Sequence, residues 1–246
     1  MREFVAAVRF LTVIPVPGRT GFSDLEMARS MAYYPLVGFC IGLILVASRH
    51  LFLLFFPQRV VAVLLVVALV LVTGALHLDG LSDTIDGLRS GRTRQERLRI
   101  MRDSRVGAFG AVGLVCILLL KLTLIAETPW SILDRSLILM ATLGRWSMVQ
   151  VIHGSSYARP EGGLARPFAL GVGRREIVVS TFSALAAAVG LFGLKGVAVL
   201  AANVLLSRGI RLYFHHRLGG ITGDVLGAAD ELSEVLSLGL VVALNP

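Results

Sequence analysis

Three aspartates that follow an apolar run could together bind a divalent cation. Asp79, Asp83 and Asp86 are spaced i, i+4 and i+7, so a helix would place all three carboxylates on one face. Like charges on one face repel each other, and a divalent cation would remove that repulsion. Mg²⁺ is usually held by one or two carboxylates together with water and substrate phosphate, so the cluster is typical of a phosphoryl-transfer site. The alternative is a solvated acidic helix end or a set of helix N-caps, because two glycines within the segment weaken a continuous helix.

A second acidic cluster follows a Gly-rich turn near the end of the chain. Asp224, Glu231 and Glu234 fall within an arc of roughly 80° on one helix, whereas we expect Asp230 to point elsewhere. These carboxylates could complete a metal site that the first cluster begins. The alternative is that Asp224 caps the helix while the glutamates line a water-filled crevice.

Basic residues could supply the binding groups for phosphate. Arg102, Ser104 and Arg105 stand immediately before an apolar segment, where guanidinium forks and free backbone N–H groups could hold a diphosphate. The alternative for such residues is ordinary charge at a membrane surface, which is also our interpretation of the other arginines between residues 89 and 99.

Three further ionisable residues lie in or beside apolar segments. Arg145 is well inside the run Ser136–Ile152, where an unpaired charge costs about 2.5–3.5 kcal/mol, so we expect it to bind substrate phosphate or to pair with an acid. Lys121 is nearer the end of its segment, and we expect it to extend its amine to the membrane surface. For His77 we expect a hydrogen-bonded position at a helix end in preference to a metal-ligand role.

The elements that must position these residues are membrane helices. With 55% hydrophobic and 16% charged residues and a mean hydropathy of +0.78, the chain is far more apolar than soluble domains, in which about 25% of residues are charged. Several runs approach the roughly 20 residues that a helix needs to cross a bilayer. These runs are Met31–Ser48, Val60–Leu76, Val106–Ala126, Ser136–Ile152, Ile177–Leu194 and Val225–Leu244. We therefore predict an all-α, polytopic integral membrane protein whose residues 1–246 form one catalytic domain.

The distribution of basic residues predicts which segments face the cytoplasm. Most of the 24 Lys and Arg residues lie before residue 30 and within 79–105, 153–176 and 207–224. The positive-inside rule places these segments and the N-terminus on the cytoplasmic side, so the predicted active site faces the cytoplasm. This topology requires residues 177–206 to form two spans that turn near Gly193, which gives about seven transmembrane helices. The apolar part of the first 18 residues is too short to span a bilayer and ends in a Pro-x-Pro break, which predicts an N-terminal interfacial helix.

Charge and cysteine content limit the partners. The net charge of +8 suits the anionic surface of a lipid bilayer or a phosphorylated substrate, whereas nucleic acid is not expected because no soluble module is available to bind it. Cys40 and Cys116 lie inside apolar runs, so we expect neither a disulfide nor a zinc site. The sequence leaves an oligomer open.

Five blocks of residues give the chain a resemblance to a known family. The blocks are LTVIPVP, YYPLVG, HLDGLSDTIDGL, MRDSRVGAFGA and GGITGDVLGAADELSE, in that order over nearly the whole chain. In these blocks the chain resembles the bacterial cobalamin synthases, the adenosylcobinamide-GDP ribazoletransferases of vitamin B12 assembly. Ser82 and Ile85 stand where we expect alanines and Arg102 where lysine is usual, and the loop Gly154–Gly173 matches more loosely.

The resemblance implies a reaction and a set of site residues. Members of this family join α-ribazole, or its 5′-phosphate, to adenosylcobinamide-GDP with release of GMP, and they need Mg²⁺. The resemblance also implies a place in the bacterial cytoplasmic (inner) membrane. It implies Asp79, Asp83 and Asp86 as Mg²⁺ ligands, Asp224 or Glu231 as a further ligand or general base, and Arg102, Ser104, Arg105 and Arg145 as groups that hold phosphate oxygens.

Two other classes of protein are weighed against this one. A Mg²⁺-dependent phosphotransferase of the CDP-alcohol type also uses aspartates at a cytoplasmic helix end, but its pattern DG-x2-AR is absent because Asp79-Gly80 is followed by LSDT. A cation-coupled transporter would be expected to carry its acids in repeated halves, and the sequence holds no internal repeat.

Overall fold

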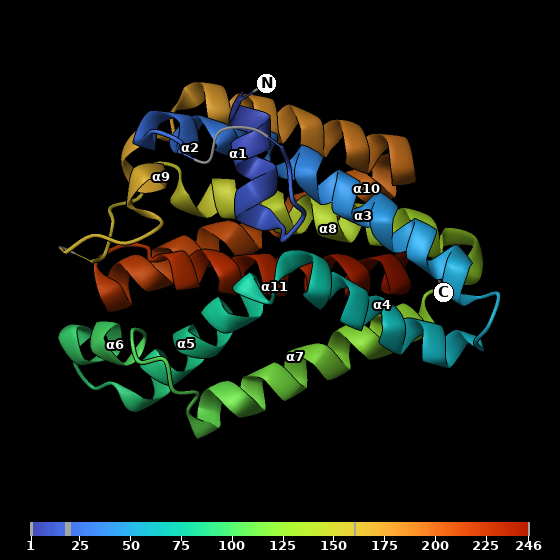
Figure 1. The fold of residues 1–246 in the computed structure, drawn as a ribbon, viewed down its shortest axis with the longest axis horizontal. Helices are drawn as coiled ribbons and strands as arrows, with labels where there is room; N and C mark the ends of the chain where they lie inside the picture. Colours follow the sequence, from blue (N-terminus) through green and yellow to red (C-terminus); the bar gives the residue numbers. More distant parts are fainter. Residues whose placement is uncertain (1, 18–20, 160, 246) are drawn as a thin grey trace.

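The protein is a bundle of helices, seen in a computed structural model that describes residues 2–17, 21–159 and 161–245 (Figure 1). The elements are α1 (Arg2–Leu11), α2 (Asp24–Ser30), a 3₁₀ turn (Met31–Tyr33), α3 (Tyr34–Phe52), α4 (Gln58–Thr73), α5 (Leu76–Ser90), α6 (Arg94–Ile100), α7 (Ala108–Glu127), α8 (Trp130–Ile152), α9 (Arg166–Gly171), α10 (Arg174–Leu218) and α11 (Gly223–Leu244). Within the described ranges the extended backbone pairs only in an isolated bridge between Tyr157 and Ile221. The predicted all-α class is confirmed.

Helix α8 lies at the centre of the bundle, with α3, α10 and α11 packed around it (Figure 1). The closest approach is made by α3, where a Cβ atom added at Gly38 would lie 2.2 Å from the carbonyl oxygen of Ala141. Further along the same pair of helices, Arg49 donates to the Asp134 carboxylate at 2.6 Å. The two helices therefore run antiparallel in contact over most of their length.

The long segment α10 is two helices that reverse direction at Gly193. This residue has φ 56° and ψ −132°, and a Cβ atom at Gly196 would lie 1.9 Å from the carbonyl oxygen of Ala188. In a straight helix those residues would be about 12 Å apart. The N-terminal half contacts the start of α8 near the turn, and the second half returns to the end of α8, where Arg211 donates to the His153 carbonyl at 3.0 Å. The predicted turn near Gly193 is confirmed.

The membrane class is supported by three helical segments that are long and apolar enough to cross a bilayer, which are Asp24–Phe52, Ala108–Glu127 and Arg174–Leu218. A fourth is added if α4 and α5, which are bent by 90°, count as one broken span. The predicted number of seven is therefore not confirmed. One physical reason is that α8 and α11 each contain several charged residues, which lowers their mean hydropathy.

Helix α1 is amphipathic and lies across the direction of α3 and α8 (Figure 1). It buries Ala6, Ala7 and Leu11 against the bundle. Its position at a membrane surface stays a prediction.

Candidate active site

The helix that carries the first acidic cluster is set by a sharp break in the chain. Gly74 and Ala75 both adopt left-handed backbone, with φ 63° and 58°, so α5 leaves α4 at 90°. Glycine takes this conformation freely, whereas alanine in it is strained. The break directs α5 along α11 (Figure 1).

Two glycines bring α5 into backbone contact with α11. A Cβ atom at Gly80 would lie 2.9 Å from the carbonyl oxygen of Asp224, and one at Gly227 would lie 3.0 Å from that of His77. The glycines that weaken the prediction of a continuous helix are therefore the residues that let two helices approach. As a result, Asp79 and Asp83 lie beside the first turn of α11.

Asp79 and Asp224 line a cavity of about 150 Å³ between α5, α11 and the loop that follows α8. Tyr157 and Arg159 from that loop complete its polar wall, and apolar residues such as Phe10 and Met148 form the rest. Asp83 stands one turn beyond Asp79, where its carboxylate interacts with the charges of Asp79, Asp224 and Arg159. The cavity is smaller than the roughly 300–1,000 Å³ of pockets for whole organic ligands, so it suits an ion with its water or part of a substrate.

Arg159 is the cation of this cavity. It forms a salt bridge with Asp224 and also donates to the carbonyl of Met101 at 3.3 Å. Its loop is tied to the start of α11, because Ala158 N donates to Ile221 O at 3.0 Å and Ile221 N donates to Ser156 O at 2.8 Å. Asp224 does not cap α11, since Thr222 occupies the N-cap position and accepts from the Val225 N–H.

Asp86 has a different environment from the other two aspartates of α5. Its oxygens accept hydrogen bonds from the N–H groups of Gly107 and Gly110 at 2.8 and 2.9 Å, so the buried carboxylate caps the start of α7. The N-cap alternative therefore holds for this residue. Among the described residues, the carboxylates of Asp79 and Asp83 have neither a hydrogen-bond nor a salt-bridge partner.

The predicted phosphate-binding residues separate into two groups. Arg102 lies in the neighbourhood of Arg159 and donates to Glu161 at 2.8 Å. Arg105 instead turns toward Asp103, and its guanidinium holds the pKa of that carboxyl at about 2. Ser104, between them, is exposed and forms no side-chain hydrogen bond within the described ranges.

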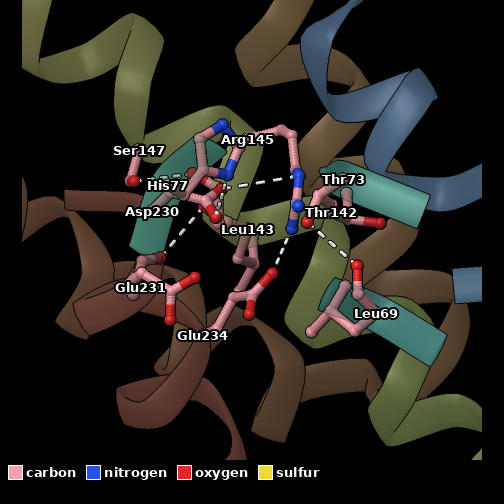
Figure 2. A network of polar contacts seen from close by, with 12 residues as sticks. Leu69, Thr73, His77, Thr142, Leu143, Arg145, Ser147, Asp230, Glu231 and Glu234 are labelled. Atoms are coloured by element: carbon pink, nitrogen blue, oxygen red, sulfur yellow. Dashed lines mark hydrogen bonds and ion pairs between the residues drawn. The ribbon is translucent and has the colours of Figure 1, made fainter. Parts of the chain in front are cut away.

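A buried ion network occupies the space between α5, α7, α8 and α11 (Figure 2). Lys121 contacts Glu231 at 2.6 Å and also pairs with Glu234, which in turn pairs with Arg145. Figure 2 shows Arg145 pointing at Asp230 and Glu234, and His77 Nδ1 lies 2.7 Å from Asp230 Oδ2. All six side chains are at most 6% exposed.

The network corrects two predictions and selects one of the two roles expected for Arg145. Lys121 does not reach the membrane surface, because two carboxylates hold its amine inside the bundle. Asp230 does not point away from Glu234: the two are spaced i, i+4 on one helix face, and ligand oxygens of Asp230, Glu231 and Glu234 lie within 4.8 Å of one another. Arg145 takes the structural alternative and pairs with Asp230 and Glu234.

The second acidic cluster is therefore divided. Asp224 faces the cavity, whereas Glu231 is two turns further along α11 and is neutralised by Lys121. His77 is paired as predicted, but it is buried rather than at a surface.

The residues of the cavity fit a hard divalent cation. Asp79 and Asp224 line the cavity, Asp83 interacts with the charges of both, and Arg159 interacts with Asp83 and Asp224. These carboxylates are spaced more widely than those of Asp230, Glu231 and Glu234, which form the group within the described ranges whose ligand atoms all lie within 4.8 Å of one another. Oxygen ligands of this kind suit Mg²⁺, which leaves coordination positions for water and phosphate. The buried network fits less well, because Lys121 and Arg145 already compensate its carboxylates.

Arg159 is a charged residue of the cavity to which the sequence assigned no role. Its loop resembles the family only loosely, and no spacing within the sequence connects it to Asp224, which is 65 residues away. One signal was present, because the loop is among the four segments enriched in basic residues.

Fold and cavity together describe a helical protein with segments long and apolar enough to cross a membrane and a cavity lined by carboxylates and an arginine. The chain belongs to the cobalamin-5-phosphate synthase family, whose model matches residues 3–242. It is 40% identical to the adenosylcobinamide-GDP ribazoletransferase of Geotalea daltonii, over 100% of this chain and 98% of that protein. It is 34% identical to the enzyme of the same name from Acetivibrio thermocellus, over 97% and 96%, and 37% identical to that of Klebsiella pneumoniae, over 97% and 98%. No solved structure matches the fold. The family resemblance of the sequence blocks is confirmed.

Proposed function

We propose that this protein transfers the adenosylcobinamide phosphate group from adenosylcobinamide-GDP to α-ribazole or α-ribazole 5′-phosphate, with release of GMP. The names of its full-length relatives support this reaction. The observation that carries the proposal is the meeting of Asp79, Asp83 and Asp224 with Arg159 beside one cavity. The three carboxylates come from two helices, and two of them have no protein partner of their own within the described ranges.

The site would hold Mg²⁺ on Asp79, Asp83 and Asp224, and the bound ion would offset charge on the diphosphate. Arg159 and Arg102 would position the phosphate oxygens, since guanidinium forks bind them with defined geometry. Asp83 or Asp224 would accept the proton of the ribazole 5′-hydroxyl as it attacks the phosphorus next to the cobinamide arm. We leave Asp86, Glu231 and Arg145 out of the chemistry, because other protein groups engage them.

The reaction would be a single displacement without a covalent phospho-enzyme. Ser82 and Thr84 beside the aspartates are buried, and their hydroxyls have no hydrogen-bond partner among the described side chains, so no base is placed to activate them. Positioning and charge compensation would then supply most of the rate enhancement, as is usual in phosphoryl transfer.

The membrane placement extends this proposal. Seven passes result if α3, the pair α4–α5, α7, α8, the two halves of α10 and α11 each cross the bilayer. The N-terminus and the cavity would then face the cytoplasm, where the arginine-rich segments lie.

The direct test is an assay of the purified protein with adenosylcobinamide-GDP, α-ribazole and Mg²⁺, scored for GMP and for the joined product. We expect both products in equal amounts, and no turnover after the cation is removed by a chelator until Mg²⁺ is restored. Absence of GMP in the complete mixture would refute the proposed function, and undiminished turnover in chelator would refute the metal role.

A further inference from the structure

A second cavity adjoins the acidic one and has the opposite charge. It holds about 430 Å³ and lies between α6, the turn that follows it and the loop after α8. It is lined by Arg94, Gln95, Leu98, Arg99, Arg102, Arg159 and Glu161. We name these residues the arginine pocket. Four guanidinium groups and one carboxylate give it a strong positive charge, and Arg159 lines both cavities.

The arginines of the pocket differ in how they are held. Arg94 is fixed, because it donates to the Ala158 carbonyl at 3.2 Å and packs on Gly219, where a Cβ atom would lie 2.8 Å from its Cζ. Arg102 forms a salt bridge with Glu161, which also lines the pocket. Arg99 has neither a hydrogen bond nor a salt bridge from its guanidinium to any described residue, although it lines the pocket. One arginine is thus fixed, and another is available to a ligand.

Arg159 supplies the second observation. One of its terminal nitrogens binds Asp224 and the Met101 carbonyl, but its Nε is buried and has no hydrogen-bond partner within the described ranges. A buried donor without an acceptor is costly, and an anion in the pocket would provide one.

We propose that the arginine pocket binds a phosphomonoester dianion next to the reacting diphosphate. The inference rests on the proposed function, which offers two carriers of this group: the 5′-phosphate of the acceptor α-ribazole 5′-phosphate, and the released GMP. A phosphomonoester has a charge between −1.5 and −2 at about pH 7 and three acceptor oxygens, which match several guanidinium forks. The pocket would thus favour phosphorylated ligands over their unphosphorylated counterparts.

The test is equilibrium dialysis of the full-length protein in detergent with radiolabelled GMP and α-ribazole 5′-phosphate, beside guanosine and α-ribazole. In the variant that combines Arg99→Gln and Arg102→Gln, we expect the affinity for the phosphorylated carrier to fall at least about tenfold, since a charged hydrogen bond is worth roughly that much or more. The affinity for unphosphorylated ligands should stay unchanged. Weaker binding of GMP alone identifies the leaving group as the occupant, and weaker binding of α-ribazole 5′-phosphate alone identifies the acceptor.

Two further variants make the test independent of folding defects. Glu161→Gln removes the one carboxylate of the pocket and should tighten binding of the phosphorylated carrier. Arg92→Gln removes the same charge from an exposed position of the same segment outside the pocket and should change nothing. Equal losses in Arg92→Gln and the double variant, or unchanged binding of both phosphorylated carriers to the double variant, would overturn the inference.

The binding experiment and the activity assay can fail independently of each other. A wild-type protein that binds the phosphorylated ligands but releases no GMP would refute the proposed function and leave the pocket in place. A protein that releases GMP while the double variant binds both ligands normally would refute the pocket alone.

Discussion

The aspartates of α5 differ in what their oxygens contact, and the difference separates chemistry from stability. Asp86 is used by the backbone of α7, whose first N–H groups it satisfies. Asp79 and Asp83 face other carboxylates instead. Substitution of Asp83 should therefore affect activity, whereas substitution of Asp86 on the same helix should affect stability.

We expect Asp83→Asn to abolish most activity while the protein stays folded. Repulsion among neighbouring carboxylates is relieved when one charge is removed, so thermal stability in detergent without Mg²⁺ should hold or rise. Thermal unfolding and GMP release measure the two effects. The matched variant Asp86→Ala should lose about 0.5–2 kcal/mol of stability, because it removes an N-cap. A loss of stability in Asp83→Asn like that in Asp86→Ala would contradict the assignment.

The buried ion network should be sensitive to the loss of any one charge. We expect Glu234→Gln to destabilise the protein by about 3–5 kcal/mol, because Glu234 is the carboxylate that pairs with both Lys121 and Arg145, so its loss breaks two buried ion pairs at once. Thermal unfolding in detergent measures the direction and size of this change in stability.

A double-mutant cycle separates this effect from simple packing. Lys121→Met combined with Glu231→Gln should cost less than the sum of the two single variants, because the pair leaves no unmatched charge between them. Additive costs would show that the two residues do not interact in the folded protein.

The roles of some individual residues could be predicted from the sequence. The clustering of Asp79 and Asp83 followed from helical spacing, and the choice for Arg145 was narrowed to two roles. The environment of Lys121 could not be predicted, because its partner Glu234 is 113 residues away and on another helix. For the same reason the sequence offered an N-cap role only as an alternative for all three aspartates and did not assign it to Asp86, whose donors belong to another helix.

At the scale of helices, glycine decides how closely the elements pack. Gly38 and Gly42 let the backbones of α3 and α8 approach, where Cβ atoms would lie 2.2 and 2.5 Å from atoms of α8. Backbone atoms cannot move aside as a flexible side chain can, so these contacts are specific for glycine.

We expect Gly38→Ala to destabilise the protein and Gly190→Ala to leave it equally or more stable. The added methyl at Gly38 meets the Ala141 carbonyl, and such overpacking costs about 1–3 kcal/mol. At Gly190 no heavy atom lies within 4 Å of the new Cβ, and alanine favours a helix by up to about 1 kcal/mol. The stabilities of the two variants are compared by thermal unfolding in the same detergent. Equal changes in stability would contradict the close backbone contact inferred at Gly38.

The two breaks in helices differ in how well the sequence predicts them. The reversal at Gly193 followed from the need to return a basic segment to the cytoplasm. The 90° bend at Gly74 and Ala75 was missed, because Val60–Leu76 is a continuous apolar run and alanine normally favours a helix. The bend at Ala75 brings α5 into contact with α11, and that contact is not recorded in the local sequence.

For the whole molecule, the arrangement predicts which ends of the helices share one side of the membrane. We expect single cysteines at Ser90 and His216, in a background without Cys40 and Cys116, to react with a membrane-impermeant thiol reagent from the same side. A cysteine at Leu194, which is 88% exposed at the turn of α10, should react from the opposite side. Labelling of Ser90→Cys and His216→Cys from different sides would contradict the proposed topology.

The sequence predicted the all-α membrane class and the family, because composition and local blocks are sufficient for both. It did not predict which helices are neighbours. That arrangement depends on contacts such as the one between Gly38 and Ala141, which no local pattern records. The arginine pocket has the same origin, since its residues come from α6, the turn after it and the loop after α8.

The ion network has a consequence for how the protein is made. Its cations Lys121 and Arg145 are on α7 and α8, whereas their three carboxylate partners are on α11, which is synthesised later. Glu234 follows Arg145 by 89 residues, so at about 5–20 residues per second the arginine waits roughly 5–20 s for its partner. During that interval the nascent chain holds two uncompensated charges among apolar helices. A chain truncated before α11 would lack the partners of both charges, so we expect it to be less stable in the membrane than the full-length protein.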